Sequence, residues 1–151
     1  MIEGAKYLHT NLIAKDWRSL ARFYDLVFGC ELVPPIREFP ASAVEAGTGV
    51  RGASLSGVHL RLPGHGQNGP TIEIFTYSDQ LPPPITAANR PGFAHIAFAV
   101  KSVAEARSEV LAAGGQPVGD IVIVTTVTGT QILWCYVTDP EGNIIELQTI
   151  L

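Results

Sequence analysis

The stretch LHTNLIAKDWRSLARFYDLVFGCEL, residues 8–32, occurs a second time in altered form as AHIAFAVKSVAEARSEVLAAGGQPV, residues 94–118. A shift of 86 residues places His9 on His95 (95 − 9 = 86) and Gly29 on Gly115. Each copy reads as a strand, a helix-start signal, an amphipathic helix and a glycine stop. The repeat therefore predicts two modules that share one fold.

Helix-start signals stand at the same place in both copies. Asp16 is the expected N-cap of the first helix, and Ser102 with Glu105 forms a capping box for the second. Gly29 and the pair at 114–115 are the expected C-terminal stops, because glycine tolerates positive φ. We expect two short amphipathic helices with these limits.

Residues typical of β-strands follow each helix. The runs are residues 31–39, 52–62 and 71–77 in the first half, and residues 117–127, 131–139 and 143–149 in the second. Each half reads βαβββ. We therefore expect an α+β fold in which two paired βαβββ modules form a cupped mixed sheet, with the helices on its outer face.

The expected modules are residues 1–77 and 93–151, together one domain, and the proline-rich stretch 78–92 is the expected linker between them. Residues 39–52 have no clear pattern, and we leave them as either a loop or a short helix.

Two histidines and two glutamates stand in four of these strands: His9, Glu73, His95 and Glu146. Side chains alternate along a strand, so each of the four is expected on the face opposite its bulky aliphatic neighbours. The aliphatic face should pack under the helix of its module, which leaves the His and Glu side chains in the concavity of the sheet. Imidazole and carboxylate are ligands that borderline divalent metals accept. The four residues are therefore a candidate metal site.

Composition excludes several classes of protein. The chain is 46% hydrophobic and 16% charged, which is typical of a globular protein, and its net charge of −4 gives no footprint for nucleic acid. The sequence contains no apolar run of about 20 residues and no signal-peptide pattern at the N-terminus, so we expect a cytoplasmic protein that does not bind a membrane. Cys30 and Cys135 lie in no redox or nucleophile motif.

Other residues that suggest chemistry are given structural interpretations. His65 lies in an expected turn and is not counted as a ligand. His59 lies on an expected strand, where it faces either the cavity or the solvent, and a functional role for it is the less favoured alternative. Two G-x-G-x-x-G matches, at residues 47–52 and 64–69, do not open a helix after a strand and are interpreted as loops.

The segments LHTNLIAKD, IEIF, GFAHIAFAV and DPEGNIIEL, with the helix between the first two, resemble the vicinal oxygen chelate superfamily. This superfamily includes glyoxalase I, methylmalonyl-CoA epimerase, extradiol dioxygenases and bleomycin resistance proteins. The resemblance implies paired βαβββ modules around one divalent metal ion (Zn, Ni, Co, Mn or Fe), with ligands at His9, Glu73, His95 and Glu146.

Four intact ligands resemble glyoxalase I more than the dioxygenases, which do not need the carboxylate at Glu73. The resemblance implies a lyase or isomerase that enolises a small, vicinally oxygenated substrate, with Glu146 or Glu73 as the base. It also implies a homodimer. An epimerase of an acyl thioester, an extradiol dioxygenase and a drug- or metabolite-binding resistance protein stay open as alternatives.

Overall fold

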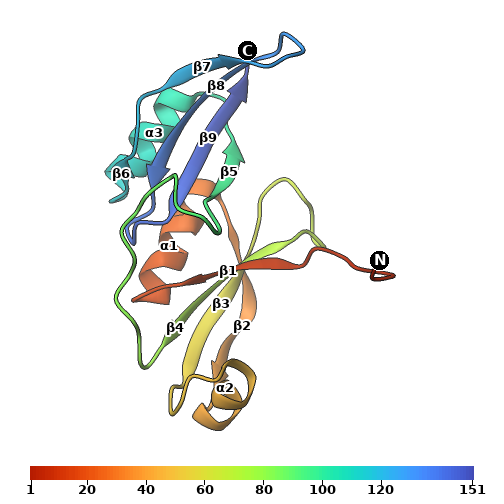
Figure 1. The fold of residues 1–151 in the computed structure, drawn as a ribbon, viewed down its shortest axis with the longest axis vertical. Helices are drawn as coiled ribbons and strands as arrows, with labels where there is room; N and C mark the ends of the chain where they lie inside the picture. The colour runs from red at the N-terminus through yellow and green to blue at the C-terminus, as the bar shows by residue number, and fades with distance from the viewer. The chain divides into compact units, whose positions relative to one another are not determined.

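Nine strands and three helices form an α+β fold, as the sequence predicts. The computed structural model describes residues 1–151 and divides into two units, Met1–Pro82 and Pro83–Leu151. Each unit contains one mixed sheet with a helix packed on it (Figure 1). The expected βαβββ order of elements is present in each unit, with one additional helix in the first unit and one expected strand divided in two in the second.

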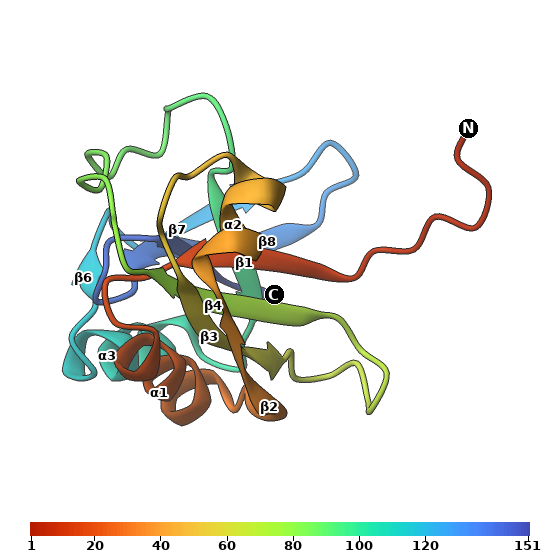
Figure 2. The same ribbon diagram turned by 90° about the horizontal axis from the view of Figure 1, so that it is seen from below.

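The first unit contains four strands and two helices. They are β1 (His9–Ile13), α1 (Trp17–Phe28), β2 (Glu31–Phe39), α2 (Ala41–Thr48), β3 (Leu55–Arg61) and β4 (Thr71–Tyr77). The sheet has the order β1-β4-β3-β2, in which β1 is parallel to β4 and the other neighbours are antiparallel. The stretch 39–52, left open by its sequence, contains α2, which lies at the end of β2 (Figure 2).

Helix α1 begins and ends where its sequence predicts. The Asp16 side chain accepts a hydrogen bond from the backbone N–H of Arg18, and Gly29 adopts the left-handed conformation with φ 67°. The residues that α1 buries lie on one face: Trp17, Leu20, Ala21, Phe23 and Tyr24. This face packs against β2, β3 and β4.

The core of the first unit lies between α1 and one face of the sheet. Val58 on β3 pairs with Ile74 on β4, and Leu60 pairs with Ile72, and all four side chains are fully buried. Full burial of such a side chain contributes about 1.5–3 kcal/mol. The residues between them in sequence, His59 and Glu73, point to the other face because side chains alternate.

The second unit repeats this arrangement. Its elements are β5 (His95–Ala99), α3 (Val103–Ala112), β6 (Gln116–Pro117), β7 (Val122–Thr125), β8 (Gln131–Thr138) and β9 (Ile144–Ile150). The order is β5-β9-β8-β6, with β7 also paired to β8 and β5 parallel to β9. Helix α3 packs on β8 and β9 (Figure 1), over the buried pairs Cys135–Leu147 and Val137–Ile145.

One strand expected as a single run, residues 117–127, is two strands, so its prediction as one continuous strand was wrong. Pro117 has no N–H to donate, and Gly119 and Asp120 are residue types that strands disfavour. Pairing with β8 resumes at Val122, opposite Trp134. Among the three helices, none has the length and apolar character needed to cross a membrane.

The N-cap of α1 gives a test of this local account. Hydrogen bonds from the Ser19 side chain and the Arg18 backbone lower the pKa of Asp16. Replacing Asp16 by Ala should cost about 1 kcal/mol of unfolding free energy at neutral pH. A carboxyl with a lowered pKa stabilises above its unfolded pKa, so the cost should be complete above about pH 5 and vanish as pH falls through the folded pKa.

Urea unfolding at pH 7 and pH 3 measures this difference. Asp25→Ala is the matched control, because Asp25 is an exposed aspartate of the same helix, and its replacement should change stability by less than about 0.5 kcal/mol. An Asp16→Ala cost that is equal at both pH values would contradict the capping role.

Candidate metal centre

The register of β1 against β4 brings His9 to Glu73. Asn11 is the partner of Glu73 across the parallel pair, and His9 stands two residues before Asn11 on the same face. His9 Nε2 lies 3.1 Å from Glu73 Oε2. Residues separated by 64 positions in sequence (73 − 9 = 64) therefore form one polar pair.

The second unit contains the same pair in the same register. Ala97 is the partner of Glu146, and His95 stands two residues before Ala97. His95 Nε2 lies 2.8 Å from Glu146 Oε2. Each His–Glu pair thus lies on a parallel strand pair with the same offset, and each is within its own unit. That all four residues bind one ion stays a prediction.

Each glutamate lies between two buried aliphatic residues of its strand. Ile72 and Ile74 flank Glu73, and Ile145 and Leu147 flank Glu146, and these four are buried to 1% exposure or less. The side chains of Glu73 and Glu146 keep 14% and 18% of their exposure. The predicted alternation is confirmed, and both carboxylates face away from the core but are only partly open to solvent.

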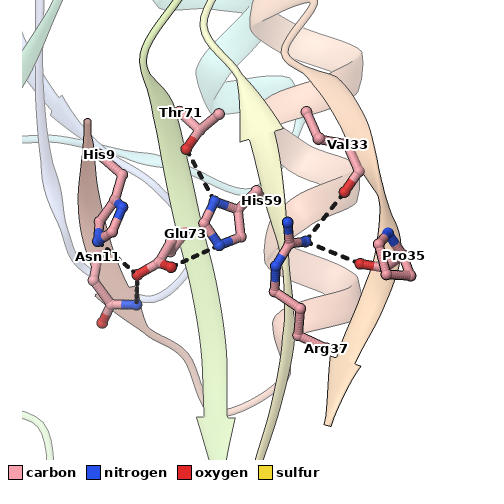
Figure 3. Close-up of polar contacts among 8 residues, drawn as sticks. All are labelled: His9, Asn11, Val33, Pro35, Arg37, His59, Thr71 and Glu73. Carbon is pink, nitrogen blue, oxygen red and sulfur yellow. Dashed lines mark hydrogen bonds and ion pairs between the residues drawn. The ribbon is translucent and has the colours of Figure 1, made fainter.

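His59 also lies beside the His9–Glu73 pair of the first unit, and the three residues form what we call the first cluster. The sequence alone did not place His59 there. It lies directly opposite Glu73 in the β3–β4 register, and its Nε2 is 2.6 Å from Glu73 Oε1 (Figure 3). The sequence left His59 facing either the cavity or the solvent, and the structure places it beside Glu73 with its side chain largely buried. The signal was the β3–β4 hairpin, because a turn centred near Gly66 pairs residues 59 and 73 (59 + 73 = 2 × 66).

Two further side chains hold this cluster. Thr71 Oγ1 lies 3.0 Å from His59 Nδ1, and Asn11 Nδ2 donates to Glu73 Oε2 at 3.3 Å (Figure 3). His9 Nδ1 is buried and has no hydrogen-bond partner, which favours the tautomer with its proton on Nε2, directed at Glu73. The Glu73 carboxylate thus accepts from three side chains.

The first cluster has the donor set of a metal site. One ligand atom from each of His9, His59 and Glu73 lies within 4.8 Å of the other two. Two imidazoles and a carboxylate fit borderline divalent ions such as Zn, Ni, Co or Fe.

Burial and the nearby charges together lower the pKa of His59. Burial lowers the pKa of His59 most, the Glu73 carboxylate opposes this, and the Arg37 guanidinium and His9 lower it further. The Arg37 side chain lies next to His59, on the side away from Glu73 (Figure 3). One of its guanidinium nitrogens donates to the carbonyl oxygens of Val33 and Pro35. The net lowering favours the neutral imidazole, which is the form that donates a lone pair.

Aromatic residues surround the pair in the second unit. Tyr136 lies opposite Glu146 in the β8–β9 register, and its ring centroid is 5.0 Å from that of His95. Trp134 packs edge-on to Tyr136. Burial, and to a lesser extent the Glu146 charge, raises the pKa of Tyr136, so its hydroxyl stays protonated. Residues 83–151 contain no histidine besides His95.

The cysteines and the remaining histidine are not members of either His–Glu pair or of the His9–His59–Glu73 cluster. Both cysteines are buried and free, and burial raises the pKa of Cys30 to about 12 and that of Cys135 in the same direction. Such thiols are not nucleophiles at neutral pH. His65 is exposed in the loop between β3 and β4.

Two modules of βαβββ order, each with a His–Glu pair on its first and last strands, define a class of two-module sheet proteins. The chain belongs to the glyoxalase/bleomycin resistance protein/dioxygenase superfamily, whose family model matches residues 6–147. No match was found among curated proteins.

Solved structures with the same fold cover nearly the whole chain. A glyoxalase family protein from Bacillus cereus is 19% identical with a TM-score of 0.77, covering 100% of this chain and 99% of that one. A virulence protein from Salmonella typhimurium is 24% identical with a TM-score of 0.56 and complete coverage of both chains, 100% each. A glyoxalase/bleomycin resistance protein/dioxygenase family enzyme from Burkholderia phytofirmans is 15% identical with a TM-score of 0.58, covering 97% and 100%. At these identities the likeness establishes the fold.

The turn before β9 positions Glu146 and gives a second test. Asp139 is 1% exposed and accepts hydrogen bonds from the backbone N–H groups of Glu141 and Asn143 and from the Asn143 side chain. Asp139→Ala leaves these donors without their partner and should cost about 1–3 kcal/mol of unfolding free energy.

Chemical denaturation measures this loss, with Asp120→Ala, an exposed aspartate of the same unit, as the control expected to change little. A loss no larger than that of the control would show that the turn does not depend on Asp139.

Proposed function

We propose that this protein is a divalent-metal-dependent lyase or isomerase of the glyoxalase I kind, which moves a proton on a carbon beside two vicinal oxygens of a small substrate. The observation that carries the proposal is the recurrence of one His–Glu pair, in one register, on the partly open face of both modules. The superfamily of the chain supports it.

In this proposal His9, Glu73, His95 and Glu146 bind one divalent ion, either Zn, Ni, Co, Mn or Fe. Two neutral imidazoles and two carboxylates suit such an ion, because the carboxylates balance its charge and four ligands leave coordination positions open. The ion supplies Lewis acidity, which stabilises negative charge on the substrate oxygens when a proton leaves the adjacent carbon.

The contacts of the two glutamates favour different roles. Glu73 accepts hydrogen bonds from the His59 and Asn11 side chains, which are not among the four proposed ligands and can hold its carboxylate in place when the ion is bound. The contact of Glu146 is with His95, itself a proposed ligand. We therefore propose that Glu146 moves and takes the proton as general base, while Glu73 serves mainly as a fixed ligand.

The proposal includes a small-molecule substrate and a homodimer as the working assembly. Val122, Ile123 and Val124 of β7 are exposed apolar residues, and a sheet edge of this kind is available for contact with a second copy.

Metal-stripped protein, assayed with the methylglyoxal–glutathione hemithioacetal, tests the reaction. We expect no isomerisation without metal, and activity restored by at least one of Ni, Co, Zn or Mn at one ion per chain. A chain that binds no divalent ion and shows no restored activity would instead be a binding protein of the resistance class. Oxygen uptake with Fe(II) and a catechol would overturn the proton-transfer assignment in favour of a dioxygenase.

Conversion of each glutamate to glutamine tests the division of roles. Glu146→Gln should lower kcat by about 10²–10⁴-fold while an ion remains bound, because general-base catalysis contributes on that scale. Glu73→Gln should mainly weaken metal binding. Steady-state kinetics beside metal analysis separates the two effects, with the exposed Glu109→Gln as the control that keeps full activity. Full proton-transfer activity in both active-site variants would refute the scheme.

A further inference from the structure

We infer that His59 is a further ligand for the metal ion at His9 and Glu73, so that these three residues of the first module hold a borderline divalent cation even when the second module supplies no ligand. This site contains a histidine that the four-residue pattern omits. It shares His9 and Glu73 with the proposed active site, but it requires neither His95 nor Glu146, and no particular reaction.

The distances within the cluster suit coordination. Metal bonds of about 2.0–2.2 Å to nitrogen and oxygen place neighbouring ligand atoms roughly 3 Å apart. Glu73 Oε2 is 3.1 Å from His9 Nε2, and Glu73 Oε1 is 2.6 Å from His59 Nε2. The two imidazole rings meet edge to face, with centroids 5.6 Å apart. Small side-chain adjustments therefore suffice to direct all three ligands at one ion.

The surroundings of the cluster fit a ligand role for His59. A metal-binding histidine commonly donates its other ring N–H to a nearby acceptor, which orients the ring. Thr71 Oγ1 stands at hydrogen-bond distance from His59 Nδ1 and can accept or donate. When His59 Nε2 gives its lone pair to a cation, the ring proton resides on Nδ1 and Thr71 accepts it. Asn11 meanwhile holds the Glu73 carboxylate from the side.

The second module is an internal comparison. The position of His59 opposite its glutamate is occupied there by Tyr136. The position of Thr71 is occupied by Ile144, which pairs with His95 as Thr71 pairs with His9, and that of Asn11 by Ala97. The extra ligand and both of its supporting groups are thus present in the first module and replaced together in the second.

The partial exposure of the cluster makes it reachable by an ion. The side chains of His59 and Glu73 are 16% and 14% exposed, and that of His9 is 34% exposed. Three protein ligands leave positions for water or for oxygens of a small ligand. The site therefore fits a cation that accepts two imidazoles and one carboxylate.

Titration of the full-length His95→Ala/Glu146→Ala variant with Co²⁺ or Ni²⁺ tests this inference. Only His9 and Glu73 of the four-residue set remain in this variant, so tight binding requires a further ligand. We expect the variant to bind one ion per chain. Calorimetry and the visible spectrum of bound Co²⁺ measure this binding. X-ray absorption should show two imidazole ligands.

Adding His59→Ala or His59→Gln to this background should weaken binding at least as much as the roughly 10- to 100-fold typical for loss of a supporting group. Glutamine can still hydrogen-bond to Glu73, so the second variant separates coordination from folding, which circular dichroism checks in each protein. His65→Ala in the same background is the matched control, because His65 is an exposed histidine outside the cluster.

A background variant that binds no ion would overturn the inference, as would His59 variants that bind as tightly as the background. In the latter case the cluster would be only a hydrogen-bonded support for Glu73. Failure here is distinct from failure of the proposed reaction, which is judged by activity of the wild-type chain and of Glu146→Gln.

Discussion

The parallel pairing of the first and last strands of each module is the constraint on which the site depends. It joins residues distant in sequence, β1 to β4 and β5 to β9, with the same two-residue offset between His and Glu. A slip of one residue would turn Ile72 and Ile74 toward solvent and Glu73 toward the core. Each buried isoleucine contributes about 1.5–3 kcal/mol, and burial of an unpaired carboxylate costs more, so the core fixes the register. The positions of the two His–Glu pairs follow from the packing of their apolar neighbours.

Similar sheets carry different polar faces in the two modules. In the first, a histidine, a threonine and an asparagine surround the His–Glu pair, whereas in the second a tyrosine, an isoleucine and an alanine take those positions. The opposite face is aliphatic in both modules, because in each it packs against a helix. The two glutamates therefore experience different restraint, which is the physical basis for assigning them different roles in the proposed reaction.

Much of the fold could be predicted from local signals. The cap at Asp16, the stop at Gly29 and the alternation around Glu73 and Glu146 depend on neighbouring residues, and these features are found as expected. The division of residues 117–127 into two strands was missed, because a proline and a glycine interrupt a run that is otherwise apolar. The outcome at those residues depends on pairing with β8, which a local pattern does not contain.

The position of His59 shows the same limit at the site. Its partner is set by the β3–β4 register, and this register depends on the length of a loop rich in glycine that sequence patterns do not resolve. His9 and His95 were found because the repeat marks them twice, whereas His59 has Tyr136 as its counterpart and leaves no repeat signal. A comparison of the two repeats finds residues that both modules share, and it does not find functional residues that only one module has.

Nitrogen-15 NMR of the histidine side chains, recorded during titration of the full chain with Zn²⁺, shows whether the two His–Glu pairs share one metal ion. The ring signals of His9 and His95 should both change, and the changes should be complete at one ion per chain, while those of His65 stay unchanged. Saturation of His9 with no change at His95, or no change at either histidine, would contradict the claim that the two His–Glu pairs share one metal ion.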